Sequence, residues 1–190
     1  MTPQSGPGIF VDKDGTLVEN VPYNVDPALL RFQPGVLQAL AALASSGFAI
    51  VVVTNQSGVA RGYFTCAQLG DLRDALASRL AEEAGVRLKG FQFCPHEPDA
   101  QGRPACPCRK PMPGLLLEAS RLYGIDLKRS WMIGDTLDDV EAGRRAGCKT
   151  ILYDSGGETL WRAAPLRRPW RRTTDWAEAA RIILTQAPCR

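Results

Sequence analysis

Strand-length apolar runs alternate with helix-length amphipathic patterns along this sequence, and this alternation constrains the fold more than any other feature. Residues 48–53 (FAIVVV) are apolar at every position, which is typical of a parallel strand covered by helices on both faces. Shorter runs at residues 9–12, 91–93, 131–133 and 150–153 predict further strands. Apolar residues at helical spacing predict helices between residues 36 and 47, between 65 and 85, and over 115–123, 137–146 and 175–184. The alternation predicts an α/β fold with a doubly wound, mostly parallel sheet.

Length and composition narrow the class of protein. The chain has 190 residues, of which 45% are hydrophobic and 23% charged, so we expect one domain over residues 1–190 and exclude disordered, collagen-like and coiled-coil chains. The longest apolar runs stop far short of the roughly 20 residues that a membrane span needs, and the first residues (MTPQSGPG) show no basic, then apolar, leader pattern. We expect a cytoplasmic monomer without a membrane partner.

Polar residues follow three of the predicted strands at the point where each strand ends. Asp12 and Asp14 come after the first strand; side chains two apart share a face, so both are expected to point into a cleft while Lys13 points away. Thr54 opens a turn (TNQSG) whose main-chain N–H groups suit an anion, and Asp135 directly follows the strand at residues 131–133. Parallel sheets bind ligands beyond the carboxyl ends of their strands, so these groups are expected to converge.

A cluster of carboxylates at one cleft requires a compensating positive charge. A hard divalent cation supplies it, and an all-oxygen site suits Mg²⁺, which in turn favours phosphate substrates. Lys110 precedes the helix that leads to the Asp135 strand, so it can offer a fixed positive charge to a phosphoryl group. Each motif taken alone also has an ordinary structural interpretation: DxDG forms turns, TNQSG is a capped turn, and lysines are usually exposed.

Three of the six cysteines and the only histidine gather in one irregular stretch. Cys94, His96, Cys106 and Cys108 offer four ligands to Zn²⁺, and four protein ligands leave no open position, so a structural zinc loop is predicted at residues 94–108. The alternative is a loop with free thiols. In a chain without a secretion signal, cysteines are expected as thiols or metal ligands rather than disulfides. The remaining cysteines are interpreted as ordinary small side chains: Cys66, Cys148 and Cys189.

The four strand-end elements, DKDGT, a strand-end Thr, a Lys and GDTLDD, resemble in this order the motifs of the haloacid dehalogenase superfamily of phosphotransferases. The longer strings FVDKDGTL, VVVTNQSGVARGYF and CRKPMPG, with the Cys-x-His and Cys-x-Cys pairs, look like the D-glycero-D-manno-heptose-1,7-bisphosphate 7-phosphatases and the related histidinol-phosphate phosphatases. The resemblance covers about residues 9–153. It implies a Rossmann-like haloacid dehalogenase fold with a small zinc-binding loop and no large cap domain.

The resemblance also implies roles for individual residues. Asp12 would be the nucleophile that forms an aspartyl-phosphate, and Asp14 the acid that protonates the leaving sugar oxygen and the base that later activates water. Thr54 and Lys110 would hold phosphoryl oxygens. Catalytic Mg²⁺ would be bound by the Asp12 and Asp135 carboxylates and the Asp14 main-chain carbonyl, with Zn²⁺ purely structural. Further predicted substrate contacts are Tyr23, Asn55, Gln56, Arg61 and Arg109.

The implied activity is that of a phosphoric monoester hydrolase in carbohydrate metabolism, which removes the 7-phosphate of a heptose bisphosphate used for lipopolysaccharide. Histidinol phosphate is the alternative substrate, followed by the 3′-phosphate of a polynucleotide. A non-enzymatic alternative is a degenerate, zinc-stabilised binding module, but retention of both Asp12 and Asp14 speaks against it.

The sequence departs from the heptose phosphatases at Thr136, because those enzymes usually have a lysine directly after the first Asp of the GDxxxD motif. Loss of that cation weakens the assignment of heptose bisphosphate as substrate. Asp138 is interpreted as an acid that complements the helix N-terminus, and Asp139 as a residue with at most an indirect role.

Five arginines lie close together near the C-terminal end, in a segment that we call the arginine-rich segment (residues 162–172). The net charge of the whole chain is only +3, which is too small to predict nucleic-acid binding. We expect the arginine-rich segment to be a solvated connector rather than a polyanion site.

Overall fold

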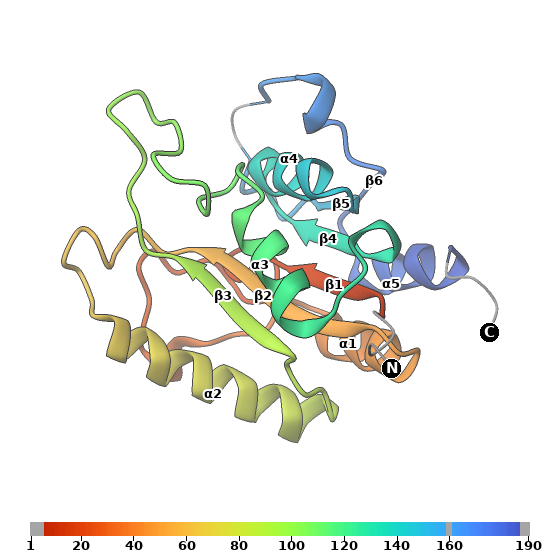
Figure 1. The fold of residues 1–190 in the computed structure, drawn as a ribbon. Coiled ribbons are helices and arrows are strands. Elements are labelled where there is room, and N and C mark those ends of the chain that lie inside the picture. Colours follow the sequence, from red (N-terminus) through yellow and green to blue (C-terminus); the bar gives the residue numbers. More distant parts are fainter. Residues whose placement is uncertain (1–5, 159–160, 187–190) are drawn as a thin grey trace.

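One six-stranded sheet, parallel throughout, organises the computed structural model, which describes residues 6–158 and 161–186 (Figure 1). The strands are β1 (Gly8–Val11), β2 (Ala49–Asn55), β3 (Gly90–Cys94), β4 (Trp131–Gly134), β5 (Lys149–Tyr153) and β6 (Arg171–Thr173). Their order across the sheet is β3-β2-β1-β4-β5-β6. The chain therefore builds outward from β1 in one direction and then returns to build in the other, which confirms the doubly wound parallel sheet.

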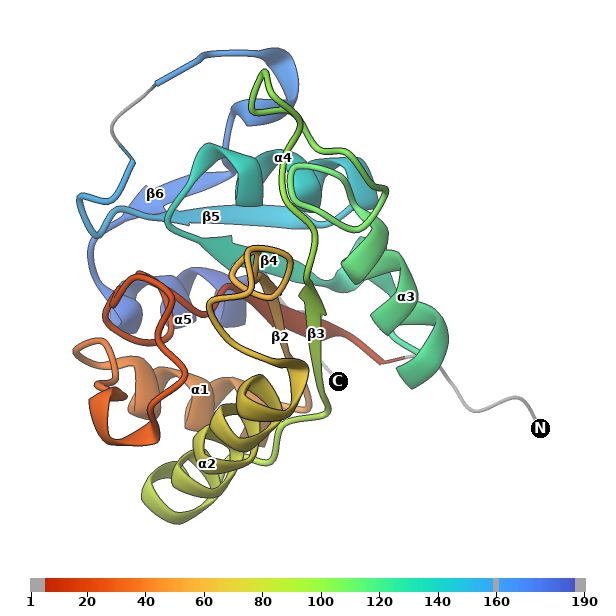
Figure 2. The same ribbon diagram turned by 90° about the vertical axis from the view of Figure 1, so that its left-hand side faces the viewer.

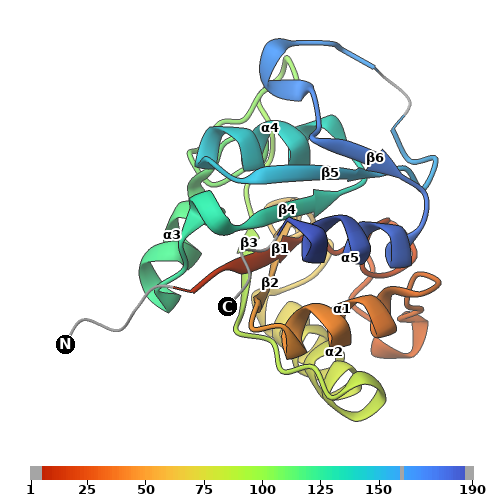
Figure 3. The same cartoon turned by 90° about the vertical axis from the view of Figure 1, so that its right-hand side faces the viewer.

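Helices cover both faces of this sheet (Figure 3). The α-helices are α1 (Val36–Ser45), α2 (Cys66–Ala84), α3 (Gly114–Tyr123), α4 (Leu137–Ala146) and α5 (Trp176–Thr185). Short 3₁₀ turns are η1 (Pro27–Leu29), η2 (Leu127–Arg129) and η3 (Pro165–Arg167). Helices α1, α2 and α5 pack on one face, and α3 and α4 on the other, so the molecule has three layers.

Strand periodicity explains why both faces are apolar. In β1, Ile9 and Val11 point into the core beneath α1, α2 and α5, whereas Phe10 points toward α3 and α4. The same division holds in β2, where Ile50 and Val52 face one layer and Val51 faces the other. A central strand with two buried faces must be apolar at every position, which is why the run in β2 does not alternate.

Helix starts follow the capping chemistry of the sequence. Thr65 caps α2 through a reciprocal pair of hydrogen bonds with Gln68, as its position predicts. Thr136 caps α4 in the same way with Asp139. The residue that stands where a lysine is usual therefore has a structural function in this chain.

The arginine-rich segment is more structured than a solvated connector, so this prediction needs correction. Residues 171–173 form β6, which pairs in parallel with β5 at the sheet edge. Arg172 forms an ion pair with Asp154, and Arg167 forms ion pairs with acids on α4. A run of arginines contains no apolar pattern, so the order of this segment comes from tertiary contacts: the ladder with β5, these ion pairs and the packing of Trp170 on Trp131.

Two irregular segments project beyond the sheet at the top of the molecule in Figures 1 and 2: the predicted zinc loop, in green, and the arginine-rich segment, in blue. Neither is large enough to be a cap domain, and no such domain is present in the described ranges. Among the described residues, no helix combines the length and the apolar character that a membrane crossing requires. Cys189 lies outside the described residues.

Candidate active site and metal centres

Acidic residues from two neighbouring strands meet at the carboxyl end of the sheet. Val11 of β1 is in register with Ile133 of β4, and the Asp12 N–H continues the ladder by donating to the Ile133 carbonyl at 2.9 Å. One carboxylate oxygen from each of Asp12, Asp135 and Asp139 lies within 4.8 Å of the others, and all three residues are buried. The structure thus brings Asp12 and Asp135 together, as the strand-end argument predicts.

The turn after β1 depends on a glycine. Gly15 has a φ of +80°, and a Cβ atom at this position would lie 2.2 Å from Oδ2 of Asp135. The backbone can therefore approach Asp135 only without a side chain. The Thr16 hydroxyl donates to Asp135 Oδ1 at 3.3 Å, and the Ser155 hydroxyl donates to Oδ2 at 3.4 Å. These contacts orient a carboxylate that would otherwise have several rotamers.

Lys110 lies inside the acidic cluster and is itself buried. Its Nζ donates to Asp12 Oδ1 at 2.5 Å and to the Val53 carbonyl at 3.0 Å, and it lies 2.6 Å from Asp139 Oδ1. Burial disfavours the ammonium, but Asp12 and Asp139 outweigh this effect and raise the pKa of Lys110. The lysine is therefore a permanent positive charge between two carboxylates.

Sequence reasoning undervalued Asp139. Its carboxylate caps α4 through Thr136 with one oxygen and neutralises Lys110 with the other. The signal was present in the GDxxxD spacing, which places this acid in the first turn of α4. Its contact with a lysine from a distant loop could not be deduced from that spacing.

Burial and like charge shape the titration of the cluster. Burial raises the pKa of Asp12 well above its usual value; Lys110 opposes this shift, while Asp139, Asp135 and Asp14 add to it. Burial, followed by the charge of Asp139, raises the pKa of Asp135 to about 7. Crowded, buried carboxylates with only oxygen donors fit a hard divalent cation such as Mg²⁺, whose charge would favour their ionised forms.

Asp14 lies at the cavity, held by two donors. Lys13 Nζ is 2.5 Å from Asp14 Oδ1, and Gln56 Nε2 donates to Oδ2 at 2.9 Å. Lys13 does not line the cavity, and its side chain is almost completely buried while its Nζ contacts the carboxylate of its neighbour. Gln56 also donates to the Thr54 hydroxyl at 2.9 Å, so one amide fixes both Asp14 and Thr54.

The other predicted substrate contacts are engaged with the protein. The Asn55 amide accepts from Lys110 N–H at 3.0 Å and donates to the Lys110 carbonyl at 3.1 Å, so it holds the lysine's backbone at the cavity. Arg109 donates to the His96 carbonyl, and Arg61 pairs with Glu97 at 3.1 Å. Neither arginine lines the cavity; nor does Tyr23, whose ring packs beside Tyr63 on the surface.

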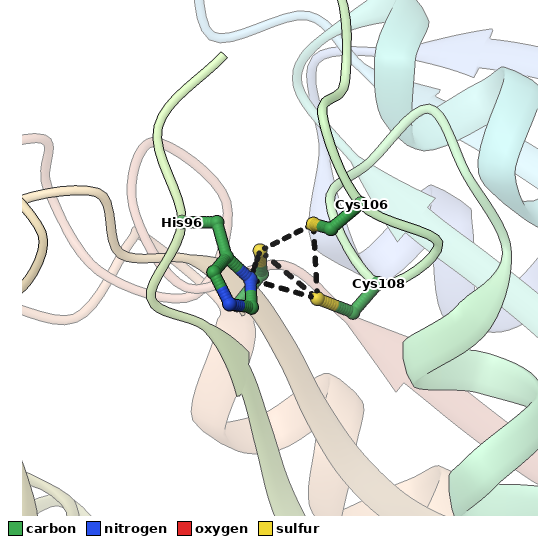
Figure 4. A group of neighbouring side chains, drawn as sticks. His96, Cys106 and Cys108 are labelled. Atoms are coloured by element: carbon green, nitrogen blue, oxygen red, sulfur yellow. Dashed lines mark hydrogen bonds between the residues drawn. The ribbon is translucent and has the colours of Figure 1, made fainter.

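The four predicted zinc ligands form one compact group, and Figure 4 shows His96, Cys106 and Cys108 turned toward one another. Cys94 Sγ lies 3.5 Å from both Cys106 Sγ and His96 Nδ1, and Cys108 Sγ lies 3.2 Å from the other two sulfur atoms. Zn–S bonds of about 2.3 Å in a tetrahedron place sulfur atoms about 3.8 Å apart, so these sulfur atoms would move apart slightly around an ion; the set of three thiols and one imidazole is one that Zn²⁺ accepts.

The three thiols differ in how readily they ionise, because burial raises the pKa of Cys94 and of Cys108. Burial opposes ionisation of Cys106, but hydrogen bonds from Cys108 and from the Arg109 N–H outweigh it and lower the pKa of Cys106 to about 7. A thiolate is the form that binds zinc. The residue after this hydrogen-bonded N–H is Lys110, so the cysteine group and the acidic cluster are joined by one short stretch of backbone.

A cavity of about 530 Å³ opens above the acidic cluster. The strand-end residues Asp12, Asp14, Thr54 and Asp135 line it, together with Lys110. Sequence reasoning missed several lining residues that come from distant loops: Asn20, Gln101, Gly102, Gly157, Glu158 and Arg162. No local motif marks them, because they reach the cavity only through the folding of their loops.

Known proteins are similar to this chain in sequence and in fold. A family model described as HAD-hydrolase-like matches residues 107–176. The chain is 43% identical over 176 residues to the D-glycero-beta-D-manno-heptose-1,7-bisphosphate 7-phosphatase of Yersinia pestis, with 91% of this chain and 90% of that protein covered. It is 39% identical to the protein of the same name from Escherichia coli K12, with 97% and 94% covered.

A solved structure agrees with these relatives. The D,D-heptose 1,7-bisphosphate phosphatase from B. bronchiseptica, complexed with magnesium and phosphate, superposes with a TM-score of 0.82 at 35% identity. The match covers 95% of this chain and 99% of that one. The predicted haloacid dehalogenase fold is thus confirmed.

Proposed function

Because this chain belongs to the family of D-glycero-β-D-manno-heptose-1,7-bisphosphate 7-phosphatases, in the haloacid dehalogenase superfamily, we propose that it removes the 7-phosphate of that sugar. The observation that carries the proposal is the meeting of Asp12, Asp135 and Lys110 at the base of one cavity. The names of the relatives specify the β anomer, which is the substrate we propose.

Asp12 is the proposed nucleophile. An oxygen of its carboxylate attacks phosphorus in line with the sugar oxygen, the new O–P bond forms as the P–O bond to the sugar breaks, and an aspartyl-phosphate results. Asp12 reaches the cavity from the end of a rigid central strand, and Lys110 holds one of its oxygens. This fixed position favours a single direction of attack.

Asp14 is the proposed acid and base. It gives a proton to the departing sugar oxygen, and then takes a proton from the water that attacks phosphorus and breaks the Asp12–phosphate bond. Lys13 and Gln56 hold its two oxygens and so define where the carboxyl group points. Thr54 and Lys110 are proposed to contact the phosphoryl oxygens, with Asn55 and Gln56 acting through these residues.

Mg²⁺ is the proposed catalytic ion, held by the carboxylates of Asp12 and Asp135 and by the main-chain carbonyl of Asp14. When bound, it supplies positive charge to the phosphoryl oxygens and to the crowded carboxylates. The B. bronchiseptica phosphatase is a complex with magnesium, which supports this choice of ion. Zn²⁺ is proposed as a structural ion at Cys94, His96, Cys106 and Cys108, where it anchors the loop that carries Arg109 and Lys110.

The proposal extends to the cellular compartment, the domain organisation and the oligomeric state. The five cysteines that the structure describes form no disulfide with one another, and three of them are proposed zinc ligands; both features suit a reducing compartment, and we propose the cytoplasm. Residues 1–190 are proposed to act as one phosphatase domain, with the zinc loop at residues 94–108. A monomer is proposed, because one chain supplies each of the proposed catalytic groups.

The test is a comparison of kcat/KM with Mg²⁺ for the two heptose 1,7-bisphosphate anomers, fructose 1,6-bisphosphate, histidinol phosphate and a 3′-phosphorylated oligonucleotide. The β heptose bisphosphate is expected to give the highest value, and phosphorus NMR is expected to show loss of the 7-phosphate alone. A higher kcat/KM for histidinol phosphate or the oligonucleotide would show that this compound, and not the heptose bisphosphate, is the substrate. No turnover of any phosphate ester would support the non-enzymatic alternative.

A further inference from the structure

The cavity carries an excess of negative charge that a substrate with two phosphates has to overcome. Its acidic lining residues are Asp12, Asp14, Asp135, Asp138, Asp139 and Glu158. Its basic lining residues are Lys110, Arg162 and Arg167. Each phosphate ester carries about −1.5 to −2 charges at neutral pH. The acidic cluster with a divalent cation can accept the reacting phosphate, so the second phosphate needs a cation of its own.

Lys110 and Arg167 are not available for the second phosphate. Lys110 is buried between Asp12 and Asp139 at the reacting end. Arg167 forms ion pairs with Asp138 at 2.6 Å and with Glu141 at 2.7 Å, and its side chain is only 19% exposed. Its guanidinium ties η3 to α4, and releasing it would break the ion pair of Asp138 and leave Glu141 paired with Arg145 alone.

Thr136, next to Asp135, is also unable to supply the charge. Its side chain is neutral, and its hydroxyl is occupied in the capping box of α4 with Asp139. Arg109, a predicted substrate contact, donates to the His96 carbonyl and does not line the cavity, so the cation for a second phosphate has to come from the rest of the cavity lining.

Arg162 is the remaining cation of the cavity. Within residues 6–158 and 161–186, no carboxylate lies at ion-pair distance from its guanidinium, and the side chain is exposed. Residues before and after it in the chain contact other parts of the fold. Trp161 packs on the guanidinium of Arg172, 4.6 Å from the ring centroid, and Arg167 anchors the segment to α4.

We propose that Arg162 binds the phosphate that stays on the sugar, and that it thereby selects bisphosphates over monophosphates. This inference rests on the proposed function and deepens it. A guanidinium offers paired N–H donors that match two phosphate oxygens, and an arginine without an acidic partner has no bond to give up when the substrate arrives. Arg162 would thus be a specificity residue contributed by the arginine-rich segment, at a distance from the reacting atoms.

The test compares heptose 1,7-bisphosphate with p-nitrophenyl phosphate, a monophosphate, in the full-length, metal-loaded enzyme. Arg162→Ala is expected to lower the ratio of the two kcat/KM values about tenfold, mainly through a higher KM for the bisphosphate, as loss of one charge-assisted hydrogen bond at an exposed site predicts. Arg162→Lys keeps the charge without the paired donors, so its ratio of kcat/KM values is expected to lie between those of the unmodified enzyme and of Arg162→Ala.

Arg168→Ala is the matched control, because Arg168 is an exposed arginine of the same segment that does not line this cavity. Its ratio of kcat/KM values for the two substrates is expected to equal that of the unmodified enzyme. An unchanged ratio in Arg162→Ala, or an equal fall in Arg168→Ala, would overturn the proposal.

A binding measurement separates this inference from the proposed function. Calorimetry on the Asp12→Asn protein with Mg²⁺ compares affinity for heptose 1,7-bisphosphate, fructose 1,6-bisphosphate and inorganic phosphate, with and without Arg162→Ala. If the enzyme fails to hydrolyse the heptose, the proposed function fails, whereas an Arg162-dependent preference for either bisphosphate still supports the inference. If the Asp12→Asn protein prefers bisphosphate over inorganic phosphate to the same extent with and without Arg162→Ala, the inference is refuted, whether or not the enzyme turns over the heptose.

Discussion

Asp12 has to satisfy two opposing requirements. Burial at the end of β1 raises its pKa, which favours the protonated form, yet a nucleophile has to be ionised. Lys110 offsets only part of this effect, since Asp139 and Asp135 lie in the same cluster. The nucleophilic form of Asp12 therefore depends on a further positive charge, which is the physical reason for a divalent cation at this site.

Replacing Asp12 tests its covalent role. Asp12→Asn keeps the shape of the side chain but removes the attacking carboxylate, so kcat is expected to fall about 10³-fold or more while the protein stays folded. Steady-state kinetics and thermal unfolding measure the two effects. Asp74→Asn, on the exposed side of α2, is the control and should leave kcat unchanged. Substantial turnover by Asp12→Asn would show that another group attacks phosphorus.

The pKa of Asp135 predicts how magnesium binding depends on pH. Its value of about 7 in the metal-free fold lies above the usual 3.8, so folding takes up a proton between these values. The metal-free protein therefore loses the stability associated with this group as the pH rises from about 4 to about 7, and Mg²⁺ restores it by replacing the proton.

The increase in Tm on adding Mg²⁺ is accordingly expected to grow between about pH 5 and about pH 8, measured at constant ionic strength. Asp135→Asn removes one ligand and one titrating group, and should show a smaller increase with a weaker dependence on pH, since Asp12 still titrates. A magnesium effect on Tm that is independent of pH in the unmodified protein would contradict the assignment of Asp135.

At the scale of elements, the zinc loop shows how an irregular segment can carry a precisely placed lysine. Residues 95–113 contain no helix or strand; the cysteine group joins the two sides of this loop, and the Asn55 amide holds Lys110 just after it. The Arg109 N–H donates to Cys106 Sγ, and Lys110 is the next residue. Zinc binding and lysine position are therefore expected to be coupled.

Zinc removal is the corresponding experiment. Elemental analysis is expected to find about one zinc per chain, and Cys108→Ser should lose it together with most of the activity, because Lys110 is no longer held. Cys66→Ser, at the exposed start of α2, is the control and should retain both. Fully active enzyme prepared without zinc would refute the coupling.

At the scale of the whole molecule, α5 supports the turn that follows β1. Trp176 at the start of α5 is fully buried, packs against Tyr153 and donates its indole N–H to the Thr16 carbonyl at 3.1 Å. Thr16 in turn contacts Asp135 through its hydroxyl. Segments from opposite ends of the chain are thus joined directly beneath the acidic cluster.

Trp176→Phe is expected to lower the free energy of unfolding by about 1 to 3 kcal/mol, because the Thr16 carbonyl loses its donor and the smaller ring leaves a void. Denaturant unfolding measures this change. Trp161→Phe, at a tryptophan that is 49% exposed, should alter stability by less than about 0.5 kcal/mol. Equal stability of the two variants would mean that α5 contributes little to the stability of the turn after β1.

The sequence by itself determined the parallel sheet and the residues at its strand ends. Apolar runs such as that of β2 admit only a doubly covered strand, and parallel strands direct Asp12, Thr54 and Asp135 to the same edge. The cysteine spacing likewise predicted the ligand group that the structure brings together. Local pattern suffices in these cases, because each depends on periodicity or on donors close in the chain.

Tertiary structure alone decided which distant groups become partners. Asp139 contacts Lys110, Arg167 joins α4, and β6 forms from arginines that have no strand pattern. Arg162 and Gln101 reach one cavity from loops that lie far apart in the chain. The physical reason is that ion pairs, edge ladders and cavity walls depend on distances in space, which residue types and spacing along a chain do not contain.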